Sequence, residues 1–246
     1  SHGGILGVFA ACWYFGRLNK IPALHLLDLT TFSGALGFFF GRIANFINGE
    51  LYGREAPSTL SWAVKFPQEI YHWGTKELDK LKLLAPAVEA VGQQGNQPAV
   101  DQATWVDWVQ RYDFAGRSGI EHFKEALVNA TQNGNQKVIE LMAPVLTPRY
   151  PSQLIQCLVE GFLVFLILLW VWRKPQKPGV MAGVFGSCYC VARIIGEQFR
   201  LPDYGIGYQW LGLTRGQWLS VAMVIAAVGL LIFSLRRPTE KIGGWK

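Results

Sequence analysis

Five apolar runs, separated by short polar or basic segments, dominate the hydrophobic pattern of the chain. They cover roughly residues 3–17, 24–48, 154–172, 180–199 and 217–235. An apolar run of about 20 residues is long enough to cross a bilayer as a helix. The third and fifth runs are the clearest, whereas the first is short and the second and fourth contain polar residues. The pattern predicts an all-α membrane helix bundle with about five spans.

A long polar segment interrupts the pattern between the second and third runs. Stretches such as "GIEHFKEALVNAT" and "KVIELMAPVL" have the spacing of amphipathic helices, and "GQQGNQP" and "QNGNQ" separate them. We expect this segment to form a small helical cap. The predicted organisation is therefore a first part of the bundle at 1–53, a cap at 54–149 and a second part of the bundle at 150–246.

Composition supports the membrane interpretation. Only 16% of residues are charged, and the chain has ten Trp and fifteen Phe, whereas soluble domains carry about 25% charged residues. The net charge of +6 does not indicate a nucleic-acid partner, because the excess lies in short clusters beside the apolar runs. These clusters are Arg17 and Lys20; Arg173, Lys174 and Lys177; and Arg236, Arg237, Lys241 and Lys246.

The basic clusters also predict an orientation. Loops rich in Lys and Arg stay on the cytoplasmic side, so "GRLNK", "RKPQK" and "RRPTEK" should face the cytoplasm. Segments 49–153 and 200–216 should then lie outside. The chain opens Ser-His-Gly-Gly without a methionine or a basic signal region. We therefore expect that a natural N-terminal segment is missing.

Ionisable residues within the apolar runs are the candidate functional residues, because charges in a membrane are energetically expensive. They are Asp28, Arg42, Glu160, Arg193 and Glu197, with Glu50 and Arg200 near the outer rim. Tyr189, Arg193, Glu197 and Arg200 share one helical face by their spacing. The polar residues concentrate in the second and fourth runs, while the third and fifth look nearly plain. Gly34, Gly37 and Gly41 are small positions that would let another helix approach closely.

Two interpretations of these residues remain open. Arg42 could pair with Glu197, or Arg193 with Glu50, simply to hold helices together. Alternatively, three converging guanidiniums offer donors suited to a phosphate, which within a bilayer is most simply a phospholipid headgroup. His2 should lie at the same outer face, where a neutral imidazole can act as a general base. Asp28 is explained by a helix N-terminal cap or by pairing with Lys20. The four cysteines lack metal-ligand spacing and are expected in the core.

The segment "GRIANFINGELYG" at 41–53 resembles the signature of the bacterial prolipoprotein diacylglyceryl transferases, Gly-Arg-x-(Gly/Ala)-Asn-Phe-x-Asn-x-Glu-x-x-Gly. "SHGG" at 1–4, "PSQL" at 151–154 and "RIIGEQFRLPD" at 193–203 are similar to further family motifs in the same order. The resemblance covers both ends of the chain, and the cap at about 60–148 lacks it.

The resemblance implies a seven-helix inner-membrane enzyme with its active site towards the periplasm, of which the last five helices are present here. It implies transfer of diacylglycerol from phosphatidylglycerol to the lipobox cysteine of a prolipoprotein, without a metal or cofactor and without nucleic acid. Membrane lipids and the prolipoprotein signal peptide would be its partners.

The resemblance also implies roles for individual residues. Arg42 and Arg193 would hold the lipid phosphate, and His2 would be the candidate base for the thiol. Glu197 and Tyr189 would orient Arg193. The remaining expected contributors to the polar substrate site are Asn45, Asn48, Glu50, Gly53 and Arg200.

Two positions depart from the family pattern. Tyr150 stands where the family usually has His, and Gln156 where it usually has Glu. An inactive or specialised paralogue is therefore an alternative to an active transferase. A membrane transport module that binds an anion or a lipid with the same arginines is a second alternative.

Overall fold

The computed structural model describes residues 2–74, 76–93, 99–112, 114–201 and 209–245. Within these residues the chain is helical, and extended pairing is limited to isolated bridges. The chain divides into two compact units. One combines residues 1–54 with 151–246, and the other spans 55–150.

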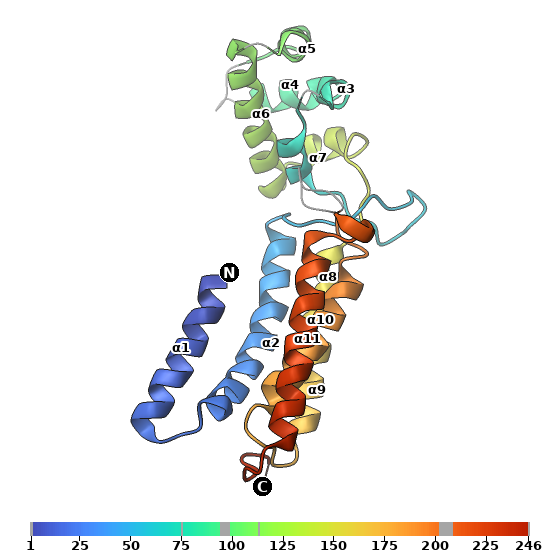
Figure 1. Ribbon diagram of the computed structural model, residues 1–246. Coiled ribbons are helices and arrows are strands. Elements are labelled where there is room, and N and C mark those ends of the chain that lie inside the picture. The colour runs from blue at the N-terminus through green and yellow to red at the C-terminus, as the bar shows by residue number, and fades with distance from the viewer. Residues whose placement is uncertain (1, 75, 94–98, 113, 202–208, 246) are drawn as a thin grey trace. The chain divides into compact units, whose positions relative to one another are not determined.

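The first unit is a bundle of long helices, each formed from one of the predicted apolar runs (Figure 1). The third run is one continuous rod in three pieces, with a π-helical turn, η2, between two α-helices. The helices are α1 His2–Asn19, α2 Ala23–Ile47, α8 Ser152–Gln156, η2 Cys157–Phe162, α9 Leu163–Trp172, α10 Val180–Gly196 and α11 Arg215–Arg236, with a short 3₁₀ turn, η3, at Trp210–Gly212.

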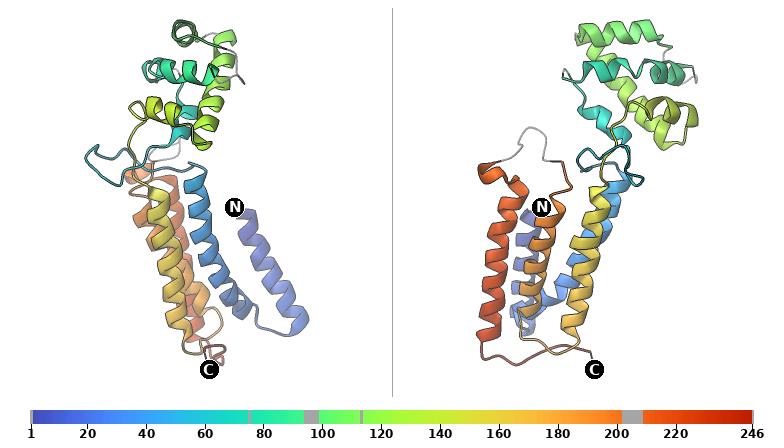
Figure 2. Two further views of the ribbon diagram at one scale, coloured as in Figure 1. Left: turned by 180° about the vertical axis from the view of Figure 1, so that it is seen from behind. Right: turned by 90° about the vertical axis from the view of Figure 1, so that its right-hand side faces the viewer.

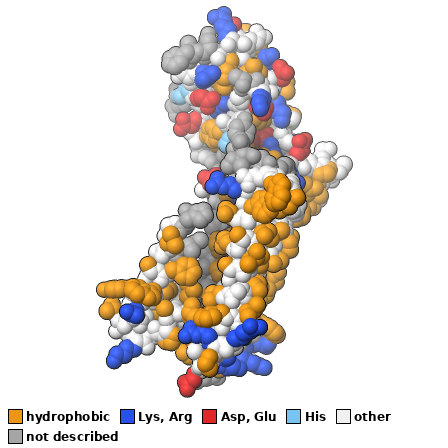
Figure 3. All heavy atoms as spheres, in the orientation of Figure 1, with side chains coloured by type: hydrophobic (Ala, Val, Ile, Leu, Met, Phe, Trp, Pro, Cys, Tyr) orange, Lys and Arg blue, Asp and Glu red, His pale blue; other side chains and the backbone are white. Residues whose placement is uncertain are grey.

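Three helices of the described residues are long and apolar enough to cross a membrane. They are α2, the rod Ser152–Trp172, and α11. The helix α10 is apolar but has only 17 residues. Figure 3 shows apolar side chains over the visible face of this bundle, with Lys and Arg gathered at the end that holds the C-terminus. That distribution is typical of a bundle surrounded by lipid and flanked by basic loops.

The helices approach each other closely at glycines, but most of these are not the glycines predicted from the sequence. A Cβ at Gly161 of η2 would lie 2.6 Å from Cα of Phe39 on α2, and one at Gly183 of α10 would lie 2.8 Å from Cα of Leu231 on α11. Gly37 and Gly41 have open space around them. The expectation that the α2 glycines form the close contact was therefore wrong for these two. The small residues that permit close packing lie on the opposing helices.

The helices of the bundle alternate in direction (Figure 2). Consequently the C-terminal ends of α2 and α10 lie at the same end of the bundle as the starts of α8 and α11. The helix α1 runs in roughly the opposite direction to α2 and meets it beside the connecting turn, where Gly16 lies against the backbone of Ile21 and Ala23. The α2–α10 and α10–α11 pairs are neighbours. This alternation decides which polar residues can meet.

At the other end of the bundle, Asp28 of α2 is buried at the start of α10. Its two carboxylate oxygens accept hydrogen bonds from the backbone N–H of Gly179 at 2.7 Å and of Ala182 at 2.8 Å. These are donors that the first turn of a helix leaves without an intrahelical partner. Asp28 is therefore a helix cap, as one interpretation predicted, but it caps α10 from a neighbouring helix. It does not cap its own helix or pair with Lys20.

The second unit packs short helices around its own apolar core. Asp101 caps α5 by accepting from the backbone N–H of Thr104 at 2.8 Å. The buried carboxylate of Glu69 pairs with Arg149 at 2.7 Å. The elements are the 3₁₀ turn η1 Pro67–His72, α3 Leu78–Lys82, α4 Ala85–Gly92, α5 Gln102–Arg111, α6 Phe114–Gln132 and α7 Gln136–Met142. The largest fully buried core side chains are Trp105, Phe123, Ile70, Leu81, Leu84, Ile120, Leu127 and Met142.

Candidate functional site

A buried ion pair between Arg42 and Glu160 is the centre of the candidate site. Nε and Nη2 of Arg42 lie 3.2 and 2.8 Å from one oxygen, Oε2, of Glu160. The Glu160 side chain is fully buried and that of Arg42 is 10% exposed. Both guanidinium nitrogens bond to the same oxygen of Glu160. The other oxygen, Oε1, therefore has no hydrogen bond to Arg42.

The packing of Gly161 explains why Arg42 meets Glu160. Gly161 lets η2 touch the backbone of Phe39, which is three residues before Arg42 on α2. The side chain next to that contact, Glu160, is thereby brought to Arg42. The interpretations that paired Arg42 with Glu197, or Arg193 with Glu50, were wrong. The true partner comes from the third apolar run, which looked nearly plain in the sequence.

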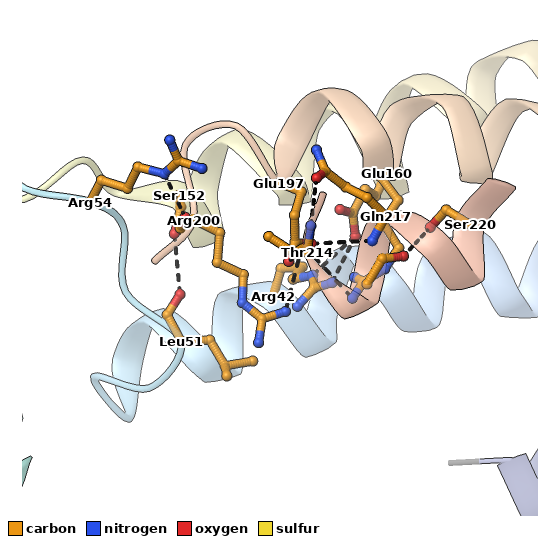
Figure 4. Close-up of polar contacts among 12 residues, drawn as sticks. Arg42, Leu51, Arg54, Ser152, Glu160, Glu197, Arg200, Thr214, Gln217 and Ser220 are labelled. Atoms are coloured by element: carbon orange, nitrogen blue, oxygen red, sulfur yellow. Dashed lines mark hydrogen bonds and ion pairs between the residues drawn. The ribbon is translucent and has the colours of Figure 1, made fainter. Parts of the chain in front are cut away.

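A second carboxylate, Glu197, lies at the end of α10 between two arginines. Its Oε2 is 3.9 Å from Nη2 of Arg193 and 3.9 Å from Nη1 of Arg200. Its Oε1 accepts a hydrogen bond from the hydroxyl of Thr214 at 3.2 Å. Figure 4 shows Glu197, Arg200 and Thr214 together with the Arg42–Glu160 pair. Arg193 and Glu197 therefore lie on one side of α10, as their spacing predicted. Because α10 ends at Gly196, Arg200 approaches Glu197 from the segment beyond the helix.

The start of α11 supports this arrangement from the other side. Thr214 and Gln217 form a capping box, in which each side chain bonds to the backbone of the other residue. Between them, Gly216 lies against the site: a Cβ there would be 3.1 Å from Oε1 of Glu197 and 3.2 Å from Nη2 of Arg193. The segment at the start of α11, at the edge of the fifth apolar run, therefore contributes to the site as well. This contribution was not predicted from the sequence.

Tyr189 lies one turn before Arg193 on α10, on the same helical face. The ring of Tyr189 stacks on Phe38 with centroids 4.3 Å apart, and Phe185 continues the stack. The stack therefore fixes the ring of Tyr189 on the helical face that also carries Arg193.

The start of the rod formed by the third apolar run carries a stripe of buried polar side chains that was not predicted from the sequence. Gln153, Gln156 and Glu160 are each fully buried, and their i, i+3, i+7 spacing places them on one face. The nearby Ser152 is also fully buried and donates from its hydroxyl to the carbonyl of Leu51 at 3.1 Å. The spacing of the two glutamines and Glu160 within an otherwise apolar run was the signal that could have found the stripe.

The remaining predicted site residues fall into two groups. Gly53 pairs its backbone with Arg200, and that arginine also accepts at its carbonyl from Arg54 Nε at 3.0 Å. The backbone carbonyl of Glu50 accepts from Nε2 of Gln153 at 2.7 Å. Among the described residues, no hydrogen bond is seen between the side chains of Asn45, Asn48 or Glu50 and the arginines or glutamates of the cluster. Asn45 is half-buried at the end of α2, and Asn48 and Glu50 are exposed just beyond it.

The structure starts α1 at His2, but the side chain of His2 lies outside the described part of the chain. The structure also describes Tyr150 and Gln156, the two residues that depart from the family motif. Tyr150 packs its ring against Trp62, with centroids 5.6 Å apart, within the second unit. Gln156 is part of the polar stripe in the bundle.

The charge of the cluster indicates the kind of ligand it can hold. Arg42, Arg193 and Arg200 carry three positive charges, and Glu160 and Glu197 carry two negative charges, which leaves one positive charge in excess. No group of three or more His, Cys, Asp or Glu in the part of the chain described here could hold a metal ion. The geometry is therefore suited to an anionic group bound by guanidiniums.

Comparison with known proteins agrees with the motifs. The family model "Prolipoprotein diacylglyceryl transferase" matches residues 1–233. The chain is 46% identical, over all of its length and 68% of the relative, to the phosphatidylglycerol–prolipoprotein diacylglyceryl transferase of Bdellovibrio bacteriovorus.

Two more distant relatives carry the same name. The Neisseria meningitidis protein is 33% identical over 96% of this chain and 65% of its own length. The Bradyrhizobium diazoefficiens protein is 31% identical over 98% of this chain and 60% of its own length. The chain thus spans about two thirds of the length of these relatives. The resemblance inferred from the motifs is confirmed, and the chain belongs to the prolipoprotein diacylglyceryl transferase family.

Proposed function

We propose that this protein transfers diacylglyceryl from phosphatidylglycerol to the cysteine thiol of a prolipoprotein lipobox, the first step of lipoprotein maturation. The convergence of Arg42, Arg193 and Arg200 at one end of the bundle carries the proposal. Membership of the family, and the names of its curated relatives, supply the substrates.

The chemistry of the transfer explains why arginines are needed. The thiolate sulfur forms a bond to the terminal glyceryl carbon, and the bond from that carbon to the phosphate oxygen breaks. The electron pair leaves with the oxygen, so the phosphodiester with one negative charge becomes a glycerol phosphate with two. Guanidiniums stabilise the second charge more than the first, and they therefore lower the barrier as well as binding the lipid. Arg42 and Arg193 take this role.

The sulfur nucleophile makes a smaller demand on the protein. A cysteine thiol has a pKa of about 8.5, so its deprotonation at pH 7 costs about 2 kcal/mol. His2 is the proposed base that receives the thiol proton. Tyr189 and Glu197 orient Arg193, and Asn45, Asn48, Glu50, Gly53 and Arg200 complete the polar substrate site.

The proposed setting is the bacterial inner membrane, with five spans of an expected seven. Basic residues gather at the end of the bundle opposite the arginine cluster, and such residues favour the cytoplasmic side. The cluster would then open towards the periplasm. The unit 55–150 would be an inserted periplasmic cap.

A transfer assay tests the proposal and separates it from its alternatives. The full-length protein is incubated with phosphatidylglycerol, labelled in its acyl chains, and a lipobox peptide. Mass spectrometry then looks for a thioether-linked diacylglyceryl cysteine. We expect the product with the wild type and its loss in Arg42→Ala protein that still inserts in the membrane. Binding of the peptide without product would favour an inactive paralogue. Flux of the lipid or of phosphate across vesicles without product would favour a transport module.

A further inference from the structure

Five buried side-chain atoms beside the arginine cluster have no hydrogen-bond partner among the described residues. They belong to residues of the α8–η2 stripe and the end of α10 that are at most 4% exposed. The atoms are Oε1 of Gln153, Nε2 and Oε1 of Gln156, Oε1 of Glu160 and Oε2 of Glu197. Each buried polar atom without a hydrogen-bond partner destabilises the folded state by about 1–3 kcal/mol, so native proteins contain few such atoms.

Two of these side chains, Gln156 and Glu160, turn towards the same point on α10. A Cβ at Gly196 would lie 3.0 Å from Cγ of Gln156, 3.1 Å from Oε1 of Glu160 and 3.5 Å from Nε2 of Gln156. The polar ends of both side chains therefore meet the one position of this turn that has no side chain. The next residue, Glu197, lies between Arg193 and Arg200, so the two polar ends adjoin the arginine cluster.

The chemistry of the five atoms restricts their ligand. Four are acceptors and one, Nε2 of Gln156, is a donor. Oε2 of Glu197 already faces Arg193 and Arg200 at 3.9 Å. An ionised phosphate brings only acceptors, so it can bind the guanidiniums but leaves the acceptors of Gln153, Gln156 and Glu160 unsatisfied. Hydroxyl groups donate as well as accept and fit the set. An ammonium group also donates, but the cluster already carries one excess positive charge, which disfavours it.

We infer that Gln156 and Glu160 form a hydroxyl-binding subsite beside the arginines, which takes the glycerol headgroup of the anionic lipid. The inference rests on the proposed function, and it assigns the headgroup selectivity of the same site. Arg42 and Arg193 bind the phosphate, and Gln156 and Glu160 form hydrogen bonds with the headgroup hydroxyls beyond it. Glu160 serves both parts, because Oε2 holds Arg42 and Oε1 faces the headgroup.

Transfer from two lipids tests the subsite. One is phosphatidylglycerol, and the other is phosphatidylpropanol, which has the same charge and length but no headgroup hydroxyls. A site that hydrogen-bonds a substrate hydroxyl discriminates strongly against an analogue without it, and we expect the wild type to prefer phosphatidylglycerol by about 100-fold or more in kcat/KM. In Gln156→Met protein the preference should fall below about 10-fold, through loss of rate with phosphatidylglycerol alone.

The melting temperature is a second readout, because a ligand-binding Gln156 and a structural Gln156 predict changes of opposite sign. Removing an amide without a protein partner should leave the melting temperature of Gln156→Met unchanged or raised. A glutamine that held the bundle together would lower it. The matched control is Gln198→Met on the exposed face after α10, which should change neither the preference nor the melting temperature.

The outcomes separate this inference from the proposed function. A wild type that transfers, with the same lipid preference in Gln156→Met, overturns the subsite and leaves the transferase intact. A raised KM for the lipobox peptide with unchanged lipid preference overturns it too, because the atoms would then serve the peptide.

A binding measurement on the wild type alone covers the case in which no transfer is seen. Glycerol phosphate should raise the melting temperature more than propyl phosphate does at equal concentration. Equal shifts from the two compounds overturn the subsite even if the protein proves not to be a transferase.

Discussion

The two ends of the bundle each bury a carboxylate, and they use it differently. At one end, both oxygens of Asp28 are occupied by backbone N–H groups at the start of α10. At the other end, Glu160 and Glu197 each have one oxygen bonded and one without a hydrogen-bond partner among the described residues. All three side chains are buried, so burial alone does not distinguish them.

The difference lies in whether the protein satisfies the charge by itself. Asp28 completes its hydrogen bonds within the fold, which is the behaviour of a structural cap. Glu160 leaves Oε1 without a hydrogen-bond partner among the described residues, and Oε2 of Glu197 is held only by ion pairs at 3.9 Å to Arg193 and Arg200. A buried polar atom without a hydrogen-bond partner in a native structure is often explained by a bound ligand or a catalytic role. We therefore expect substitutions at one end to change stability and substitutions at the other to change transfer.

Breaking the Arg42–Glu160 pair should have the largest effect. Arg42→Met leaves the Glu160 charge buried without its partner, and loss of one member of a buried pair destabilises by about 3–5 kcal/mol. Transfer should be lost as well. Thermal denaturation in detergent and the transfer assay measure the two effects.

The double variant Arg42→Met, Glu160→Leu separates the effect on stability from the effect on transfer. Replacing both charges by apolar groups should restore much of the stability, because such replacement is often neutral. Transfer should stay absent. If the double variant regained transfer, Arg42 would be a structural residue and the contrast between the two ends would fail.

The next effect is expected at Asp28. Asp28→Ala leaves two backbone N–H groups of α10 without their acceptor and should lower the free energy of unfolding by about 1–3 kcal/mol. The kcat of the folded protein should not change. The control Asp79→Ala removes an exposed carboxylate paired with Lys82 and should cost less than about 1 kcal/mol. A large drop in kcat with normal stability in Asp28→Ala would contradict the structural assignment.

A smaller effect is expected where α11 touches the site. A methyl group at Gly216 would press on Glu197 and Arg193 at 3.1 and 3.2 Å. Displacement by a few tenths of an ångström should lower kcat/KM by about 10-fold, which is about 1.4 kcal/mol in the barrier. Gly229→Ala on the same helix meets no atom within 4 Å and is the matched control. Equal activity in the two variants would remove α11 from the site.

The smallest effect concerns an exposed carboxylate, which shows what burial adds. The hydroxyl and backbone N–H of Thr104 hold the pKa of Asp101 below its ordinary value of 3.8. A lowered folded pKa contributes stability that is present above the ordinary pKa and is lost as pH falls through the folded pKa. Asp101→Ala should therefore speed hydrogen exchange in α5 slightly at pH 7, with the difference from wild type shrinking below pH 4. A difference that persisted at low pH would exclude the charge as its cause.

Local patterns predicted much of the bundle. Each of the five apolar runs forms a helix, and the four-residue spacing correctly placed Arg193 and Glu197 on one face, because a helical period is a property of the local chain. Arg200 lies beyond the end of α10 and reaches Glu197 from the segment that follows. The signature around Arg42 led to the family, which the comparisons confirm.

Tertiary contacts could not be predicted in the same way. The pairing of Arg42 with Glu160 depends on Gly161 meeting the backbone of Phe39, a contact between helices more than 100 residues apart in sequence. The cap from Asp28 to α10 likewise joins distant segments. Most glycines on α2 were wrongly expected to make the close contact, because sequence alone does not show which face a neighbouring helix will cover.

The most direct test of the arginine site is a single-turnover measurement with Arg193→Ala. Protein saturated with phosphatidylglycerol is mixed with a lipobox peptide, and the rate of thioether formation is followed. Because the guanidinium stabilises charge that grows in the transition state, its loss should lower that rate by about 100- to 1,000-fold, with a smaller change in lipid affinity. A wild-type rate in Arg193→Ala protein that is inserted and folded would contradict the account.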